Sequence, residues 1–104
     1  MLTASDVKAE IERRATMYLS RDKSGIRKAV LEFVLKIQSV TVQQVYEFLS
    51  TRFTVTMKSV ASMLGIITAK LGILSVKRER DGDLSVYEIK PQYVAMVTRL
   101  VAGA

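Results

Sequence analysis

The sequence contains no cysteine and no histidine among its 104 residues, and only one proline. Without thiols and imidazoles, the chain can form no disulfide, no thiolate nucleophile, no imidazole base and no Cys/His zinc site. These absences predict an intracellular protein without a metal. Hydrophobic residues make up 49% of the chain, which argues against a disordered or proline-rich segment and predicts a globular fold.

Long hydrophobic runs are also missing. The uncharged stretch at residues 59–69 is far shorter than the roughly 20 apolar residues that cross a bilayer, and the start of the chain lacks the apolar core of a signal peptide. We therefore expect a cytoplasmic protein with no membrane partner. At this length we expect a single domain, residues 1–104, near the size at which a second subunit often adds stability.

Groupings of side chains that could catalyse a reaction are equally scarce. The chain has ten carboxylates, but none has a neighbour suited to acid-base chemistry or metal binding. Asp81 and Asp83 flank a glycine, which is typical of a tight turn, because a calcium loop needs more oxygen ligands and a distal Glu. No Gly-rich phosphate-binding loop is present. The sequence thus predicts a protein that is not an enzyme and has no cofactor.

The clearest pattern that is present lies in residues 56–72. Apolar residues recur at i, i+4, i+7 and i+11, namely Val60, Leu64, Ile67 and Leu71. This spacing is typical of a helix with one face on the core. Thr56 is suited to cap the start of the helix, and Gly72 can take the left-handed conformation that follows a helix end. We therefore predict one helix between these two residues.

After Gly72 the apolar period changes to two. Residues 73–80 and 84–90 are predicted strands that flank Asp81-Gly82, a dipeptide that favours tight hairpin turns. A register centred on this turn pairs Leu74 with Ile89, Val76 with Tyr87, and Arg78 with Ser85. One face of the hairpin is then apolar at the base and polar toward the tip, which indicates a hairpin that is anchored on the core and projects into solvent.

Five further segments complete the expected order. These are an amphipathic helix at 5–19 capped by Ser5 or Thr3, a helix at 26–37, a short third strand at 39–42, a helix at 42–52 followed by a turn at 53–55, and a last helix opened by Pro91. The residues expected to face the core are Val7, Ile11, Ala15 and Tyr18 in the helix at 5–19. In the helix at 26–37 they are Ile26, Val30, Phe33 and Ile37, and in the helix at 42–52 they are Val45, Phe48 and Leu49.

The helix at 26–37 is apolar over so wide a surface that it needs cover on two sides. The N-terminal helix, the C-terminal helix or a second subunit could provide it. The N-terminal helix could equally serve as core cover or as a dimer contact. For the C-terminal helix, which spreads apolar residues over more than one stripe, the pattern slightly favours a dimer interface with its symmetry mate.

The formal net charge of +6 is concentrated in one part of the chain. Residues 56–80 contain five basic residues and one acidic residue, a net +4, on the predicted central helix and the first hairpin strand. Such a concentration is expected where a protein contacts nucleic acid. The basic loop at 20–28 could also follow a phosphate backbone, although short charged loops are more often simply solvated.

The segments SRDKSGIRKAVLEFVLKI, VASMLGIITAKLGIL and VKRERDGDLSVYEIK resemble members of the winged helix-turn-helix superfamily. More narrowly, they resemble a family of small uncharacterised archaeal proteins. The resemblance implies a mainly α fold with a small β-hairpin, in the α+β class. Its winged-helix core would span residues 23–90, with an extra N-terminal helix in 1–20 and an extra C-terminal helix in 91–104.

The same resemblance implies a transcriptional regulator that binds double-stranded DNA, with a recognition helix at 56–72 and the hairpin as a basic wing. The front of the helix would enter the major groove through Thr56, Lys58, Ser59 and Ser62. The wing would contact phosphates through Lys77, Arg78 and Arg80. We also expect a homodimer that forms through the N-terminal helix, the C-terminal helix or both.

One feature departs from the members of the superfamily that read DNA sequence. After Ser62, the outward face of the predicted recognition helix consists of Gly65, Ile66 and Ala69 with Lys70. It lacks the Arg, Asn and Gln that make bidentate contacts with base edges. The sequence therefore predicts weak or shape-led DNA preference. The alternative is a protein-protein interaction module that does not bind DNA, in which this small-residue face packs against a partner chain.

Overall fold

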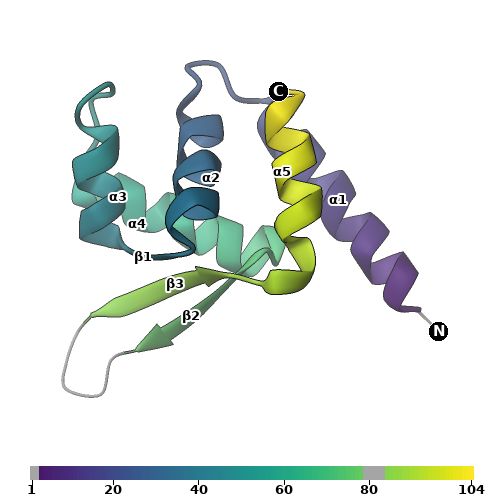
Figure 1. Cartoon of the computed structure of the whole chain (residues 1–104). Helices are drawn as coiled ribbons and strands as arrows, with labels where there is room; N and C mark the ends of the chain where they lie inside the picture. The colour runs from purple at the N-terminus through teal and green to yellow at the C-terminus, as the bar shows by residue number, and fades with distance from the viewer. Residues whose placement is uncertain (1–2, 79–83) are drawn as a thin grey trace.

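The computed structural model describes residues 3–78 and 84–104. These residues form five α-helices and a small sheet, connected by short loops (Figure 1). In chain order the elements are α1 (Ala4–Ser20), α2 (Ile26–Ile37), β1 (Ser39–Thr41), α3 (Val42–Leu49), α4 (Met57–Ile66), a π-helical turn η1 (Ile67–Leu71), β2 (Leu74–Arg78), β3 (Ser85–Ile89), a 3₁₀ turn η2 (Pro91–Tyr93) and α5 (Val94–Ala102). The order from α2 to β3 is the winged-helix arrangement that the sequence resemblance implies.

The sheet is antiparallel, with the strand order β1-β3-β2. The predicted hairpin register is confirmed at all three pairs: Leu74 with Ile89, Val76 with Tyr87, and Arg78 with Ser85. The short strand expected at 39–42 is also present as β1 and pairs Val40 with Tyr87. The Asp81-Gly82 turn and Asp83 lie outside the described residues. Leu74 at the start of β2 is buried whereas Val76 is exposed, so β2 leaves the core along its length.

Threonines begin three of the helices. The hydroxyls of Thr3, Thr41 and Thr56 each accept a hydrogen bond from the backbone N–H three residues later, and each cap N–H donates to the side chain at that later position. These capping boxes satisfy N–H groups that have no partner within the helix. Of the two caps considered for α1, Thr3 is therefore correct. The helix α2 begins differently, because the Asp22 carboxylate accepts from the backbone N–H groups of Gly25, Arg27 and Lys28.

The helix α3 is shorter than predicted and ends at Leu49 instead of continuing to Arg52. The hydroxyls of Ser50 and Thr51 donate to the carbonyls of Glu47 and Phe48. Such bonds compete with continuation of the helix. The connection from α3 to α4 therefore begins at Ser50 and is longer than the predicted three-residue turn.

The core is built around α2, which packs against α3 and α5 and also contacts α1, β1 and β3. Its buried residues are Ala29, Val30, Leu31 and Val34. The predicted inward set was therefore wrong in part, since Ile37 keeps 43% of its surface exposed and Ile26 and Phe33 are only partly buried. The expected cover of α2 on more than one side is present, but it buries Ala29, Leu31 and Val34 more completely than Ile26, Phe33 and Ile37. Phe33 instead stacks on Phe48 at 4.4 Å between ring centroids.

Both terminal helices cover the core, and they pack against each other. Ala15, Tyr18 and Leu19 of α1 are buried, whereas Val7, which was expected on the inward stripe, is exposed. Arg99 of α5 donates to Glu12 of α1 at 2.9 Å. Figure 1 shows this helix pair on the side of the molecule opposite α3. Among the described residues, no helix is both long and apolar enough to span a bilayer.

The connection from α2 to β1 depends on a strained residue. Gln38 has φ 72° and ψ −38°, a region that side chains with a Cβ rarely occupy. Its N–H donates to the Val34 carbonyl at 2.7 Å, and its carbonyl accepts from Ile89 at 3.1 Å. These two bonds tie the end of α2 to the sheet and hold the residue in this conformation.

We expect Gln38→Gly to raise the free energy of unfolding by about 1 kcal/mol, because glycine adopts this conformation without the Cβ clash. Urea denaturation of both proteins measures the change. Gln43→Gly within α3 is the control and should lower stability by about 1 kcal/mol. A Gln38→Gly protein no more stable than the parent would contradict the assignment of strain.

Candidate nucleic-acid interface

The front of α4 is exposed, but its four predicted contact residues fall into two groups. The Thr56 hydroxyl accepts from the Ser59 N–H at 3.0 Å, and the Ser59 hydroxyl accepts from the Thr56 N–H at 3.1 Å and donates to the Thr56 carbonyl at 2.9 Å. These two side chains therefore fix the helix start. Lys58 and Ser62 are exposed one turn apart on the helix, where they can reach a ligand.

The opposite face of α4 holds the helix in place. Its predicted apolar stripe is confirmed, since all four residues are buried: Val60, Leu64, Ile67 and Leu71. Gly72 ends the segment in the left-handed conformation, with φ 76°, as predicted. The prediction of one regular helix was wrong at the last turn, because residues Ile67–Leu71 form a π-helical turn. Its Lys70 carbonyl accepts from Arg14 of α1 at 3.2 Å, which gives this turn a partner outside the helix.

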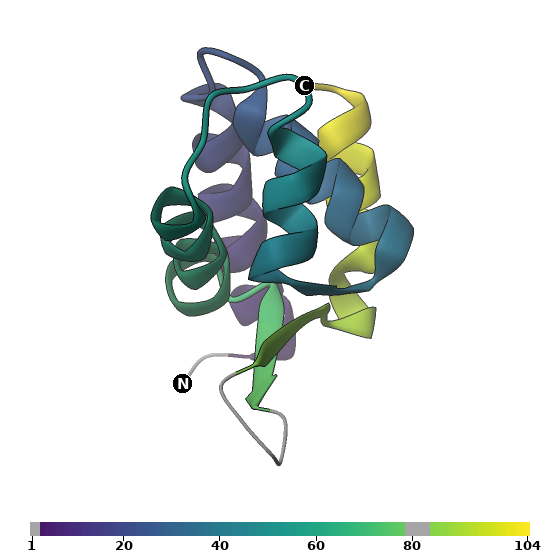
Figure 2. The same cartoon turned by 90° about the vertical axis from the view of Figure 1, so that its left-hand side faces the viewer.

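The wing carries the next two predicted contacts. Lys77 and Arg78 are both exposed on β2, which is an edge strand. They are neighbours in the strand, so their side chains point to opposite faces of the hairpin. Arg80 lies outside the described residues. Figure 2 shows the hairpin extending beyond the helical body below α4.

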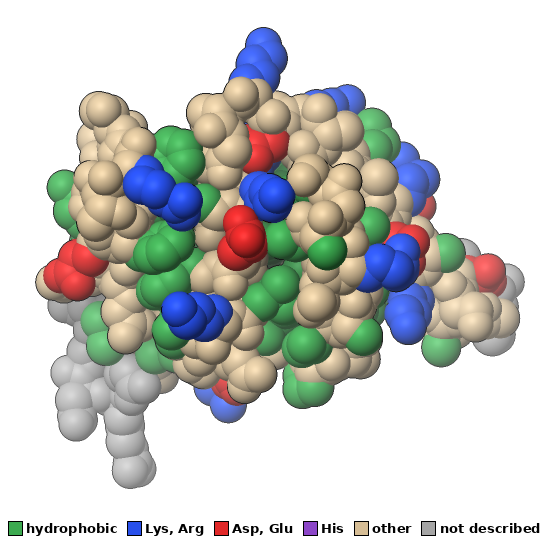
Figure 3. Space-filling view, turned by 45° about the horizontal axis from the view of Figure 1, so that its top comes forward, with side chains coloured by type: hydrophobic (Ala, Val, Ile, Leu, Met, Phe, Trp, Pro, Cys, Tyr) green, Lys and Arg blue, Asp and Glu red, His purple; other side chains and the backbone are tan. Residues whose placement is uncertain are grey.

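Carboxylates are absent from the whole segment that forms α4 and β2. Residues 48–78 contain no Asp or Glu, whereas Arg52, Lys58, Lys70, Lys77 and Arg78 all fall within it. The surface seen in Figure 3 differs, because there Lys and Arg alternate with Asp and Glu and with exposed apolar patches. Of the two surfaces, the one built by α4 and β2 is the better suited to a polyanion.

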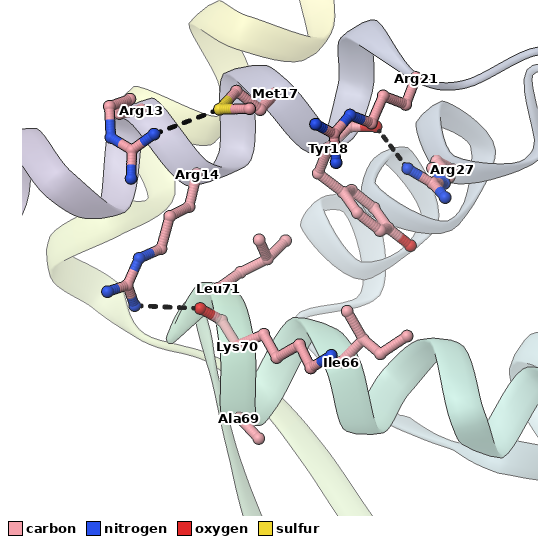
Figure 4. A pocket seen from close by; sticks show the side chains of 10 residues that line it. All are labelled: Arg13, Arg14, Met17, Tyr18, Arg21, Arg27, Ile66, Ala69, Lys70 and Leu71. Carbon is pink, nitrogen blue, oxygen red and sulfur yellow. Dashed lines mark hydrogen bonds between the residues drawn. The ribbon is translucent and has the colours of Figure 1, made fainter.

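The small-residue face of α4 forms one wall of a groove, which we call the α1–α4 groove (Figure 4). Its volume is about 610 Å³, and α1 forms the other wall. Its basic residues are Arg13, Arg14, Arg21, Arg27 and Lys70. Its remaining residues are Met17, Tyr18, Ile66, Ala69 and Leu71. Sequence reasoning identified Ile66, Ala69 and Lys70 as a face but missed the arginines of α1 opposite them.

Several of these cations are held by specific contacts. Arg27 donates to the Tyr18 carbonyl at 2.9 Å, and its guanidinium lies 4.4 Å from the centre of the Tyr18 ring. Burial raises the pKa of the Tyr18 hydroxyl. Arg13 donates to Glu10 at 3.0 Å, and this hydrogen bond is the main reason that the pKa of Glu10 falls to about 2. The basic loop at 20–28 thus contributes both Arg21 and Arg27 to the groove, and Arg27 also packs on Tyr18.

Together, the three helices α2, α3 and α4 and the β2–β3 hairpin define a winged-helix protein, with α1 and α5 as the extra helices. The chain belongs to the family described as "Protein of unknown function (DUF2551)", whose model matches residues 15–97. A relative from Archaeoglobus fulgidus, described as an uncharacterized protein, is 32% identical over 93 residues, which cover 88% of this chain and 93% of the relative.

Among solved structures, the oxidized form of MarR from E. coli superposes with a TM-score of 0.58 at 19% identity. The match covers 98% of this chain and 76% of MarR. At this identity the likeness concerns the fold alone, and it confirms the mainly α winged-helix class predicted from the sequence.

The capping box at Thr56 gives a direct test of the helix start. We expect Thr56→Ala to lower the free energy of unfolding by about 1 kcal/mol, because the Ser59 N–H loses its acceptor. Thr56→Ser keeps the hydroxyl and should stay close to the parent. Urea denaturation distinguishes the two, and equal stability of the alanine and serine variants would show that the cap contributes nothing.

Proposed function

We propose that this protein binds double-stranded DNA and acts as a transcriptional regulator without enzymatic activity. The main observation is that Lys58 and Ser62 of α4 and Lys77 and Arg78 of β2 are all exposed, on two elements whose own residues include no carboxylate. A winged helix places its recognition helix in the major groove and uses the wing for the backbone. Arg80, the third basic residue of the wing segment, is proposed to join the phosphate contacts. We further propose that residues 1–104 act as one domain in the cytoplasm.

Within this proposal the side chains have different roles. Lys58 and Ser62 approach the groove, whereas Lys77 and Arg78 neutralise phosphates on the two sides of the wing. Thr56 and Ser59 contribute by orienting the start of α4, since their hydroxyls already bond within the cap. Because Arg, Asn and Gln are missing from the α4 face beyond Ser62, we propose that sequence preference is weak and depends mainly on DNA shape.

The first test is a fluorescence titration of a random-sequence DNA duplex at several salt concentrations. Replacing both Lys77 and Arg78 by Ala should weaken binding to every duplex. It should also flatten the log-log salt slope by about 0.9 for each lost phosphate contact. Lys58→Ala should weaken binding as well, since it removes a cation at the groove.

The double variant Lys8→Ala/Lys36→Ala removes the same charge from exposed positions on α1 and α2 and serves as the control. It should bind DNA almost like the parent. If both double variants lose affinity equally, the charge acts through the net field and the wing assignment fails. Absence of binding at low salt would contradict the proposed function itself.

We also propose a homodimer that forms through α1 and α5. Exposed small residues on these two packed helices, Thr16 on α1 and Ala95 on α5 among them, allow a second copy to approach closely. A two-fold dimer would present two recognition helices to successive turns of a duplex.

Analytical ultracentrifugation tests the dimer. We expect the parent to sediment as a dimer and Thr16→Glu/Ala95→Glu to sediment as a folded monomer, because the carboxylates would repel one another across a two-fold interface. Ser50→Glu/Thr51→Glu places the same charges at the end of α3 and should leave the dimer intact. A parent protein that sediments as a monomer would contradict this assignment.

A further inference from the structure

The α1–α4 groove combines exposed apolar surface with positive charge. Met17 on α1 and Ile66 on α4 keep 39% and 38% of their surface exposed, although both are large and apolar. They belong to facing walls, and the buried Leu71 and Tyr18 also line the groove. Large apolar side chains that stay exposed in a concave site are typical of a surface that a partner covers.

Among the described residues, five cations and no carboxylate line the groove, while Glu10 pairs with Arg13 and Arg14 from outside it. Arg27 is positioned by a bond to the Tyr18 carbonyl, and Arg14 by bonds to the Lys70 carbonyl and to the Glu10 carboxylate, so each uses only part of its guanidinium. Arg21 and Lys70 are exposed, and within the described part of the chain their side chains form no hydrogen bond or ion pair. The groove therefore offers several fixed or available donors to an anionic group.

The mixture of residue types identifies the kind of occupant. Arg, Met and aromatic residues are enriched in protein-protein interfaces, while Asp, Glu and Lys are depleted. Four arginines, one methionine and one tyrosine line this groove, against a single lysine and no acid. A small inorganic anion would satisfy the cations but would leave Met17 and Ile66 in water, so an occupant must bring apolar surface as well.

We propose that the α1–α4 groove binds an acidic amphipathic helix of another protein. Its apolar face would cover Met17 and Ile66, and its carboxylates would pair with Arg21, Lys70 and the free N–H groups of Arg14. Of the described residues that line the groove, all but Arg21 belong to α1, α2, α4 or the η1 turn, and none belongs to a strand. Recognition therefore resembles a helix laid in a groove and not an added strand.

The proposed site is separate from the proposed DNA contacts. The groove uses the last residue of α4 and the η1 turn. In contrast, Lys58 and Ser62 lie on the first two turns of α4, and Lys77 and Arg78 lie on β2. The proposal therefore does not depend on DNA binding. A bound helix would nevertheless contact the same recognition helix that the DNA would contact.

The test uses a fluorescein-labelled synthetic peptide with Leu at i, i+3, i+4 and i+7 and Glu at the other positions. Its control peptide has the same composition in an order that places Leu around the whole helix. We expect fluorescence anisotropy to give a Kd of about 10–100 μM for the first peptide and binding at least about tenfold weaker for the second. If the two peptides bind equally well, charge attraction alone explains their binding and the proposal is overturned.

Protein variants locate the site. Ile66→Ser and Arg21→Ala/Lys70→Ala should each weaken peptide binding about tenfold, since they remove an apolar and a charged contact. Ile37→Ser and Lys8→Ala/Lys36→Ala change comparable exposed residues elsewhere and should leave binding unchanged. If all four variants lose peptide binding, or if both groove variants bind the peptide as well as the parent does, the peptide binds outside the groove.

The remaining outcomes distinguish other occupants. Displacement of the peptide by millimolar inorganic phosphate would indicate a small-anion site, and a dimer that dissociates on Ile66→Ser would indicate a second copy of this chain. Each of these results overturns the proposal, as does failure of the patterned peptide to bind. Lys77→Ala/Arg78→Ala should keep peptide binding, so failure of the DNA proposal is distinguished from failure of this one.

Discussion

The burial of α2 among its neighbours is the constraint on which the rest of the structure depends. Val30 and Val34 are inaccessible to solvent, and α3 and α5 pack along the helix on different sides. Removing so much apolar surface from water is the largest favourable term available to a chain of this size. It also explains why a minimal winged helix would be incomplete here: without α5 and α1, part of the apolar surface of α2 would face water.

The helix α4 connects this core to the proposed function. Its buried stripe, with Leu64 and Ile67 at the centre, fixes its rotation about its own axis. Because a helix repeats every 3.6 residues, fixing the buried face also determines which residues face outward. Lys58 and Ser62 are therefore presented by the packing of other residues, and the cap at Thr56 determines where the first exposed turn begins.

Two surfaces meet on α4. Its first turns and β2, neither of which contains a carboxylate, form a basic surface suited to phosphate, while its C-terminal end and the η1 turn join α1 in a groove that mixes arginines with exposed Met17 and Ile66. The likeness to MarR supports the fold that places these surfaces and not an activity, since one fold can carry unrelated functions. The two surfaces differ in chemistry, and this difference makes the DNA proposal and the partner proposal separable by experiment.

The sequence alone determined the features that depend on near neighbours. The stripe from Val60 to Leu71, the cap at Thr56, the Gly72 stop and the hairpin register were predicted correctly, and Thr3 was one of the two caps considered for α1. Periodicity and capping involve residues a few positions apart, so they can be inferred without knowing the fold. The exposed positions of Lys58, Ser62, Lys77 and Arg78 were predictable for the same reason.

Only the tertiary structure decided which side of α2 is buried, where the π-helical turn falls, and which residues face the small-residue side of α4. Ile37 was misplaced because its burial depends on neighbours from several elements. The α1–α4 groove could not be predicted, since Arg14 and Lys70 are separated by 56 positions in the chain and meet only through packing. The physical reason is that local sequence patterns determine which face of a helix or strand is apolar. The contacts that this face and the opposite face make are determined only when all the elements pack together.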